Sequence, residues 1–539
     1  MDLNAHLYAI GLPGPRQEGS ADAMGFKAWN LARLAAIGLP VPPAFVLGTP
    51  LCARHRADPA AFRPHLRTLL ETQIERLEAV CGLEFGSERK PLLVSVRSGA
   101  AVSMPGMMDT VLDVGLTDAT LRGLLRVTGN PRLAWDSYRR LIQQFAEVVH
   151  GAPAEPFQTL LHDAIAQAGV SRAQDLDFRD LSRLCRHYQD AYAQTVGQPF
   201  PQDPAQQLLD ATAAVFDSWM SPRAVAYRRL QGLDDGLGTA ITVQRMVFGN
   251  AGGTSGAGVG FTRDPASGEN RLYLDFRFNA QGEDVVSGRH AAAENGRMAL
   301  VLPSVLSRLQ SVREILEREF GDVQEFEFTV QDGVLYLLQT RAAKRTDWAA
   351  LRIAVDQVTA GAWSPATALR RLDGVDLPGI VQTRIEAAGT DRELATGTPA
   401  SIGVASGVIA LDAAAAERFA QTGTECILVR DETRSDDLAG IAAAQGVITA
   451  KGSRTAHAAV VARQLGKACL VGCNGLRVDL ERRRVVFGTQ SLHEGERITV
   501  DCGSGRVLAG AVRAFVERPD VWLDQVARWR AIAGPALVG

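Results

Sequence analysis

The spacing of hydrophobic residues divides the chain into stretches with different expected structures. Residues 120–230 follow a helical period, as in the run from Leu133 to Ala146, where apolar side chains recur every three or four positions. From Thr239 to Arg341, short apolar runs alternate with turn residues, which predicts strands. We therefore expect residues 1–345 to form a domain of helices and strands, with a helical insertion at about 113–200.

The pattern changes in the second part of the chain. Residues 346–395 predict two linker helices, Trp348–Val358 and Ser364–Leu372, the second beginning with a proline in its first turn. Residues 396–515 alternate strand and helix on a short repeat, which is typical of an α/β domain. Residues 516–539 predict a C-terminal helical tail. The expected elements of the α/β domain are strand Cys426–Arg430, helix Ser435–Ala444, strand Gly446–Ala450, helix Ala456–Leu465 and strand Ala468–Val471.

Composition narrows the class of protein. The chain has 539 residues, of which 46% are hydrophobic and 22% charged, and these values predict a globular protein of several domains. A net charge of −3 argues against binding to nucleic acid or to a membrane surface. No membrane span and no signal peptide are expected. The seven cysteines form no Cys-x-x-Cys pair, which predicts reduced thiols in a cytoplasmic protein and no zinc site.

A glycine-rich segment is the first candidate for ligand binding. Six of the twelve residues from Gly249 to Gly260 are glycines, and the segment lies between the predicted strands Ile241–Phe248 and Val259–Thr262. Glycines allow backbone N–H groups to close over phosphates, so we expect contacts from Gly252, Gly253 and Gly256. No Gly-Lys-Ser/Thr follows, which excludes a Walker A loop. A hairpin without a ligand is the alternative.

Two strands joined by a short loop form the second candidate. If Val330 pairs with Val334 across the loop, alternation places Glu325, Glu327, Gln339 and Arg341 on one face. Two carboxylates and an amide oxygen suit a hard divalent cation such as Mg²⁺, which keeps water ligands and bridges phosphates. The alternative is a solvated face on which Arg341 forms an ordinary ion pair.

Two further residues suit phosphate chemistry. An apolar strand from Pro91 delivers Arg97 to a turn, and the planar guanidinium binds phosphate oxygens in pairs. From Gly446 to Lys467 the chain predicts a strand, a polar loop and a helix, with His457 near the helix start after Thr455 as an N-cap. An imidazole there is a candidate nucleophile, and a phosphoryl group on it would occupy an anion site. The alternatives are a surface arginine and an incidental histidine in a capped helix.

The histidine segment resembles a known family. The runs Thr455–Arg463 and Ile427–Thr433 resemble the phosphohistidine motif of the pyruvate phosphate dikinase and phosphoenolpyruvate synthase family. The resemblance implies that His457 takes a phosphoryl group from ATP and passes it on. It also marks Thr455 as a candidate regulatory phosphorylation site. Ser453 and Arg454 stand where the family usually has Gly and Met.

The resemblance extends through the first domain. The run Gly25–Leu31 resembles the family's N-terminal lysine motif, so Lys27 corresponds to the nucleotide-binding lysine, while Phe26 and Ala28 replace glycines. The segments Ser103–Thr110 and Thr262–Glu269 favour the dikinase over the synthase. The resemblance implies that Glu327 and Gln339 bind the metal and the nucleotide, and that the phosphates contact Arg97 and Arg341.

The resemblance implies a fold and a reaction. The expected fold is α/β and α+β with several domains: an ATP-grasp-like nucleotide-binding domain, a helical linker and a swivelling phosphohistidine domain. ATP with Mg²⁺ would charge His457 with its β-phosphoryl group, and either orthophosphate or water would take the γ-phosphoryl group. The family's pyruvate-binding barrel would follow Phe515, where only residues 516–539 remain. Three acceptors stay open: pyruvate on a separate subunit, another small molecule, or a protein partner of a phosphocarrier. The oligomeric state also stays open.

Overall fold

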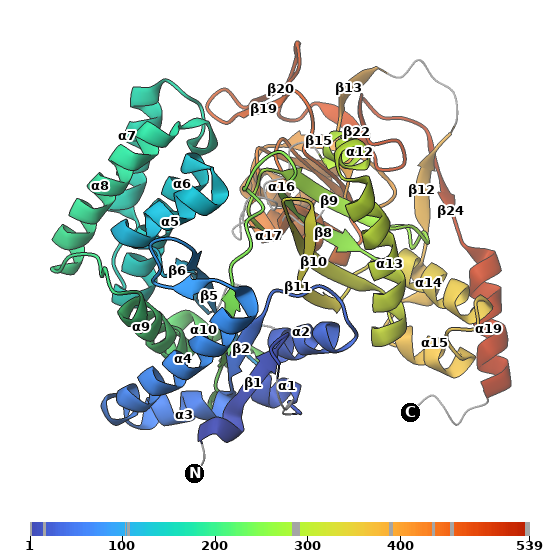
Figure 1. Cartoon of the computed structure of the whole chain (residues 1–539). Coiled ribbons are helices and arrows are strands. Elements are labelled where there is room, and N and C mark those ends of the chain that lie inside the picture. The colour runs from blue at the N-terminus through green and yellow to red at the C-terminus, as the bar shows by residue number, and fades with distance from the viewer. Residues whose placement is uncertain are drawn as a thin grey trace. The chain divides into compact units, whose positions relative to one another are not determined.

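A computed structural model describes residues 3–13, 18–102, 104, 108–282, 291–386, 392–433, 437–452 and 457–533 (Figure 1). The chain divides into two compact units. The first contains residues 1–253 and 330–340, and the second contains residues 254–329 and 341–539. Within the described ranges, none of the helices combines the length and the apolar character needed to cross a membrane.

The first unit is built on a five-stranded antiparallel sheet. Its strand order is β1-β2-β7-β5-β6. The strand predicted at Ile241–Phe248 begins one residue earlier and ends at Arg245. The strands are β1 (Leu7–Ile10), β2 (Ala44–Leu47), β5 (Val94–Gly99), β6 (Thr110–Val114) and β7 (Ala240–Arg245).

Both faces of this sheet are buried. Val94, Val96 and Val243 belong to a core that also contains residues of α3 (Thr49–Ala57), α4 (Pro59–Cys81) and α9 (Pro204–Asp217). On the opposite face, α2 (Phe26–Ala36) contacts β1 and β5. Because side chains alternate along a strand, Arg97 points away from the core that holds Val96.

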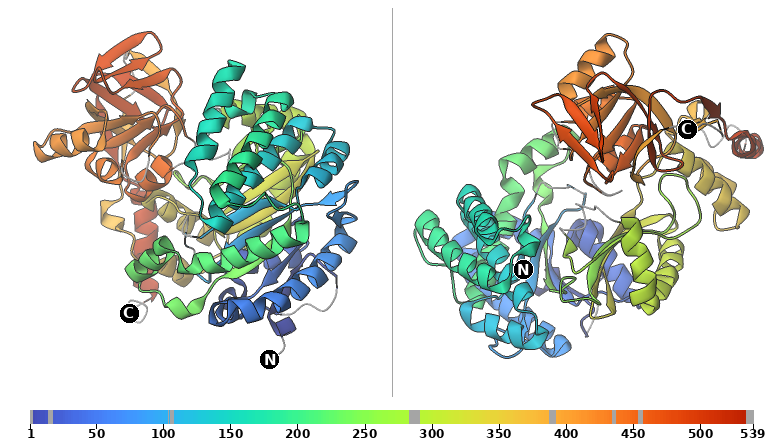
Figure 2. Two further views of the ribbon diagram at one scale, coloured as in Figure 1. Left: turned by 90° about the vertical axis from the view of Figure 1, so that its left-hand side faces the viewer. Right: turned by 90° about the horizontal axis from the view of Figure 1, so that it is seen from above.

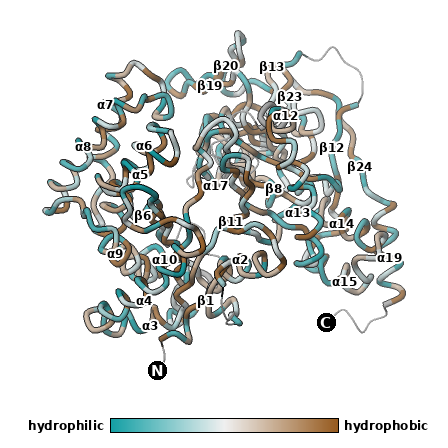
Figure 3. Tube along the Cα trace, in the orientation of Figure 1, coloured by the Kyte–Doolittle hydropathy of each residue, from teal (hydrophilic) through white to brown (hydrophobic). Residues whose placement is uncertain are grey.

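A group of helices follows β6. Three of them start at polar caps: Thr117 forms a capping box with Thr120, and Asn130 and Asp177 accept hydrogen bonds from first-turn N–H groups. Figure 3 shows hydrophobic and hydrophilic stretches alternating along α7 and α8, as expected for helices that bury one face. The helices are α5 (Asp118–Thr128), α6 (Pro131–His150), α7 (Glu155–Ala168) and α8 (Phe178–Val196).

The second unit begins with β8, β9 and most of β10, three strands of a sheet of order β11-β10-β8-β9, while residues 330–340, which include most of β11, belong to the first unit. The aromatic rings of Phe276 and Phe328 stack with centroids 5.8 Å apart, and those of Phe326 and Phe328 lie 6.0 Å apart. The strands are β8 (Gly256–Phe261), β9 (Tyr273–Phe278), β10 (Gln324–Gln331) and β11 (Val334–Ala342), and α12 (Ala291–Val301) and α13 (Pro303–Phe320) precede β10.

The two helices expected as linkers are α14 (Asp347–Thr359) and α15 (Pro365–Arg371). They are anchored to the second sheet: the Thr346 hydroxyl donates to the Ala266 carbonyl at 2.6 Å, and Asp322 pairs with Arg345 at 2.7 Å. The C-terminal helix α19 (Asp520–Ala533) packs on them, with Trp348 and Trp522 rings 5.3 Å apart. These contacts pack both helices of the expected linker within the second unit.

A two-stranded ribbon lies where the chain enters and leaves the last domain. β12 (Gln382–Ile385) pairs antiparallel with β24 (Ala514–Glu517), so that Gln382 lies opposite Glu517 and Ile385 opposite Ala514. Arg384 and Glu517 form an ion pair across it. A two-stranded ribbon is only marginally stable by itself.

The last domain contains an eight-stranded sheet, orange and red in Figure 2, of order β13-β23-β22-β15-β16-β17-β18-β14. Its parallel centre consists of the strand–helix alternation that the sequence predicts. The parallel strands are β15 (Val404–Ala410), β16 (Cys426–Arg430), β17 (Gly446–Thr449) and β18 (Ala468–Val471), connected by α16 (Ala413–Gln421), α17 (Leu438–Ala443) and α18 (His457–Gln464). The chain then forms β19 (Leu476–Asp479), β20 (Arg484–Phe487) and β21 (Gln490–His493), a three-stranded antiparallel sheet.

Candidate functional site

Lys27 lies in the first turn of α2, and this turn is fixed against the end of β5. Gly25 has a φ of +77°, and a Cβ added there would overlap the Gly99 carbonyl. The Phe26 N–H donates to the Ala100 carbonyl at 2.9 Å. No side chain caps the helix. The exposed Lys27 therefore sits at an uncapped helix N-terminus, which is a favourable place for an anion.

Arg97 lies on the same face of the first sheet as α2. In β5 it is paired with Thr110 of β6 and Thr242 of β7. The side chain is half-buried, and it makes no hydrogen bond or ion pair with any residue that the structure describes. A half-buried guanidinium in this position is suited to an anionic ligand, because such a ligand would replace the lost hydration.

A hollow opens beside Lys27. Its lining combines the lysine with the apolar side chains of Phe26, Val102, Met104 and Met108. The segment Ser103–Thr110 was expected only as a family signature, but two of its methionines and Thr110 line this hollow. A methionine-rich run directly after the arginine strand was the available signal.

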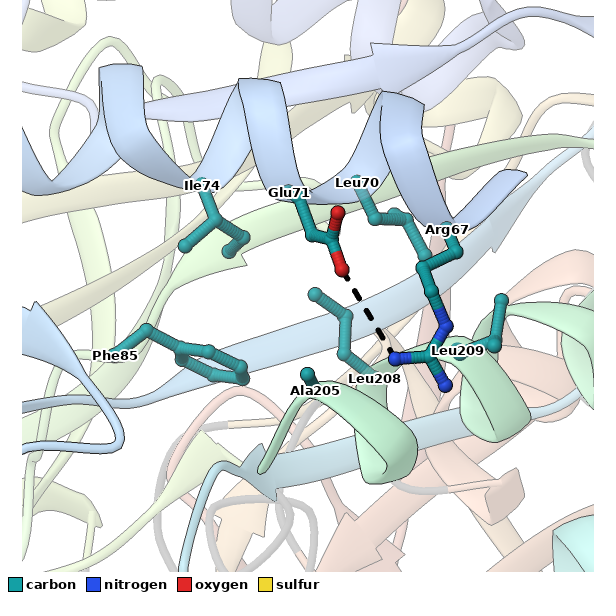
Figure 4. A pocket seen from close by; sticks show the side chains of 8 residues that line it. All are labelled: Arg67, Leu70, Glu71, Ile74, Phe85, Ala205, Leu208 and Leu209. Atoms are coloured by element: carbon teal, nitrogen blue, oxygen red, sulfur yellow. Dashed lines mark ion pairs between the residues drawn. The ribbon is translucent and has the colours of Figure 1, made fainter. Parts of the chain in front are cut away.

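A second hollow lies between α4 and α9 in the same unit (Figure 4). Leu70, Ile74 and Phe85 contribute to its apolar lining, and Arg67 pairs with Glu71 at its edge, 3.9 Å apart. None of the residues predicted to bind a ligand lines this hollow.

The acidic hairpin brings Glu325 and Arg341 together. The Arg341 guanidinium donates to the Glu325 carboxylate at 2.6 Å, and Glu325 is 7% exposed. Burial alone would lower the pKa of Arg341, but the hydrogen bond to Glu325 and the charges of Glu325 and Glu327 outweigh it and raise that pKa. The ion pair named as an alternative for this face is therefore present, and Glu325 is occupied by it.

The hairpin leaves other oxygen ligands for a metal. Glu327 is half-buried in β10, and Gln339 is half-buried in β11, which belongs to the first unit. Across the described residues, no three His, Cys, Asp or Glu side chains gather into a metal cluster. This donor chemistry fits Mg²⁺, which needs few protein ligands because phosphates and water complete its shell.

The glycine-rich segment has two parts with different surroundings. Gly252 and Gly253 lie in a turn, and a Cβ added at either would meet no atom within 4 Å. Gly256 begins β8, and a Cβ there would overlap the ring of Phe276. The predicted second strand, Val259–Thr262, therefore starts three residues too late, and Gly256 has a packing reason of its own.

His457 is the first residue of α18, which follows β17 of the parallel sheet. The helix begins one residue after the predicted start and ends one residue before the predicted end. The side chain of His457 and residues 453–456 lie outside the described part of the chain, so the prediction for Thr455 is untested. Arg430, at the end of β16, pairs with Asp437 at 3.2 Å and thereby fixes the loop edge next to β17.

Two family models match the chain. Residues 59–298 match the model described as pyruvate phosphate dikinase, AMP/ATP-binding domain. Residues 423–505 match the model described as PEP-utilising enzyme, mobile domain. The first match covers the glycine-rich turn and much of the first unit, and the second includes α18 with His457.

Three relatives illustrate the similarity. The chain is 40% identical to pyruvate, phosphate dikinase of Rhizobium meliloti (strain 1021), over 94% of this chain and 58% of the relative. It is 41% identical to the chloroplastic pyruvate, phosphate dikinase 1 of Oryza sativa subsp. japonica, over 95% of this chain and 55% of the relative. It is also 41% identical to pyruvate, phosphate dikinase 2 of Zea mays, over 95% of this chain and 59% of the relative.

The chain thus spans little more than half the length of these relatives. The two matched domains lie in the order that the sequence motifs indicated, with the nucleotide-binding motifs before the histidine motif. Through these two domains, the chain belongs to the pyruvate phosphate dikinase family of PEP-utilising enzymes.

Proposed function

We propose that this protein is an ATP-dependent phosphotransferase that charges its own His457. The β-phosphoryl group of ATP passes to the imidazole, orthophosphate takes the γ-phosphoryl group, and AMP and pyrophosphate leave. One observation carries the proposal: Arg97, half-buried and without a described partner, lies on the face of the sheet where α2 presents Lys27. Two cations and a helix N-terminus suit a polyphosphate.

The roles of the other residues follow from charge. Lys27, Arg97 and Arg341 neutralise the phosphates, and backbone N–H groups at Gly252 and Gly253 close over them. Mg²⁺ is held by Glu327 and Gln339 and supplies further charge neutralisation at the phosphates. Glu325 holds Arg341 in place through the 2.6 Å ion pair. Phosphoryl transfer depends mainly on such positioning, because the protein does little covalent chemistry.

The nucleophile is one nitrogen of His457, at the start of α18. A phosphoryl group bound there is stabilised by the N–H groups of the first turn. The domain that carries α18 is connected through the β12–β24 ribbon, which allows it to move between a charging position and an acceptor.

The proposed final acceptor is pyruvate, bound on another polypeptide region. The three relatives above are named pyruvate, phosphate dikinases, and this chain spans 55 to 59% of their length. Among the described residues, the sheets include no closed eight-stranded parallel barrel of the kind that the resemblance implies for pyruvate binding.

The charging step is tested with ATP labelled separately at the β and γ positions and with intact-mass analysis. The wild type should gain the β label, and His457→Ala should gain none. Equal labelling of the alanine variant would remove His457 from the reaction.

The metal assignment has its own test. Glu327→Ala should abolish charging without changing the unfolding temperature, while Glu481→Ala, at an exposed carboxylate of the last domain, should charge normally. Full labelling of Glu327→Ala at low Mg²⁺ would contradict the role of Glu327.

The phosphate site is tested at Arg97. Arg97→Met should raise the ATP concentration needed for half-maximal charging by about tenfold or more, because it removes a charged hydrogen-bond donor. An unchanged ATP requirement would show that the guanidinium does not bind the nucleotide.

A further inference from the structure

The helix that begins with His457 ends in a buried arginine. Arg463 lies in the last turn of α18 and is 3% exposed. Its guanidinium lies over the ring of Phe261, with the central carbon 5.9 Å from the ring centroid. It also donates to the Ala400 carbonyl at 3.3 Å. An arginine with this geometry joins two parts of the second unit by a cation–π contact.

Phe261 belongs to the face of the second sheet that carries the acidic residues. The Thr262 N–H donates to the Gln324 carbonyl at 2.9 Å, and the Gln324 N–H donates to the Thr262 hydroxyl at 3.0 Å. Thr262 and Gln324 are therefore opposite each other, which places Phe261 opposite Glu325. Opposite residues in neighbouring strands share a face, so Phe261 is a neighbour of the carboxylate that pairs with Arg341.

The position of this contact limits where His457 can lie. α18 is a helix of 8 residues, and a helix rises about 1.5 Å per residue, so its two ends are about 12 Å apart. Because the helix is rigid over this length, holding its last turn on Phe261 keeps its first residue within about 12 Å of that turn. The contact thus joins the helix of the proposed nucleophile to the sheet of the proposed metal ligand.

We propose that Arg463 is a positioning residue for the charging of His457, acting through Phe261. The inference rests on the proposed function. Arg463 contacts the ring of Phe261 and the Ala400 carbonyl, and neither residue is a proposed ligand of the nucleotide or the metal. Its loss should slow charging at saturating ATP and leave ATP affinity unchanged. A lysine has no planar guanidinium that can lie on the ring while it donates to Ala400. Arg463→Lys should therefore charge almost as slowly as a variant that lacks the cation.

The experiment is a double-mutant cycle of Arg463→Met, Phe261→Leu and the double variant. The first-order rate of β-label transfer is measured at saturating MgATP, and the Kd is measured with a non-hydrolysable ATP analogue. Each single variant should lose about 5- to 30-fold in rate, the range of a buried cation–π contact. The double variant should lose no more than the worse single variant, because either change removes the same contact.

Two control variants distinguish the loss of the Arg463–Phe261 contact from a loss of folding. Phe261→Tyr keeps the ring and should charge at the wild-type rate, and Arg477→Met removes an exposed arginine of β19 and should also charge normally. Thermal unfolding of every variant identifies loss of structure. If the effects of the two single changes multiply in the double variant, Arg463 acts only inside its own domain, through Ala400, and the inference fails.

The outcome also distinguishes the inference from the function on which it rests. A wild type that gains no β label overturns the proposed function itself. A wild type that charges, with Arg463→Met charging equally fast, overturns only the role of Arg463.

Discussion

The two halves of the glycine-rich segment use the same residue type for different physical purposes. In the turn, Gly252 and Gly253 face open space, and Gly252 has a φ of +149°. In β8, the backbone is extended, and Gly258 and Gly260 leave room for aromatic rings of β10. A Cβ at Gly258 would lie 2.6 Å from Cζ of Phe328. The first half is thus free to approach a ligand, while the second half is required by packing.

This difference shows why a glycine-rich run is weak evidence for phosphate binding. The rings that demand glycine in β8 come from β9 and β10, which are distant in the sequence. A count of glycines in the sequence does not distinguish glycines that leave room for a ligand from glycines that leave room for a packed ring. The atoms around each glycine in the structure do distinguish them. Single substitutions should therefore distinguish glycines required by packing from glycines free to approach a ligand.

Gly260→Ala should have the largest effect. The new Cβ would overlap the ring of Phe326, which is 1% exposed and has little room to move. We expect the free energy of unfolding to fall by about 2–3 kcal/mol, as in other overpacked cores. Urea denaturation measures it. A loss below about 0.5 kcal/mol would mean that packing does not require this glycine.

Replacing Phe326 by a smaller residue should restore part of the stability that Gly260→Ala loses. Phe326→Leu alone should cost about 1–1.5 kcal/mol, but added to Gly260→Ala it should recover about 1 kcal/mol, because it removes the overlap. Urea denaturation of the two single variants and the double variant measures the coupling free energy between the two positions. Additive losses would contradict direct contact as the cause.

Gly252→Ala should cost less, because only backbone strain is involved. A residue with a side chain rarely adopts a φ of +149°, although a Cβ there meets no atom. We expect a loss of about 1 kcal/mol in the free energy of unfolding. A loss as large as that of Gly260→Ala would place this residue with the packing glycines.

Gly253→Ala should have the smallest effect on stability, below about 0.5 kcal/mol, because the added methyl group meets no atom. If the turn closes over phosphates, the ATP concentration for half-maximal charging should rise about fivefold, as for a loss near 1 kcal/mol. The measurement is the ATP dependence of β-label transfer. If neither the free energy of unfolding nor the ATP concentration for half-maximal charging changes, the turn is not part of the proposed site.

Local patterns were enough to predict the centre of the last domain. The strands at Cys426–Arg430 and Ala468–Val471 have the predicted ends, and α18 differs by one residue at each end. Such segments are short, apolar and bounded by glycines and polar residues, so their structure depends on neighbours in the sequence. The Glu325–Arg341 ion pair was also foreseeable, because strand alternation and one hairpin loop place the two residues together.

Features that depend on distant partners were not foreseeable. The helices predicted as a linker are held at two points by Asp322, which pairs with Arg345 and also with Arg371 at 2.6 Å. Nothing near these residues in the sequence indicates that contact. Arg463 had a weak signal, as a charge that follows the apolar run Ala458–Ala462, but its partner Phe261 lies about two hundred positions away.

The β12–β24 ribbon makes the histidine-bearing domain a self-contained cassette. Because Ile385 and Ala514 lie opposite each other, the segment between them could be excised and the gap closed by a two-residue Asn-Gly turn. The remaining protein would keep both ribbon strands and the helix α19 that packs beyond them. The excision would also remove the contact between Arg463 and Phe261, so an inserted module would have to cover that ring.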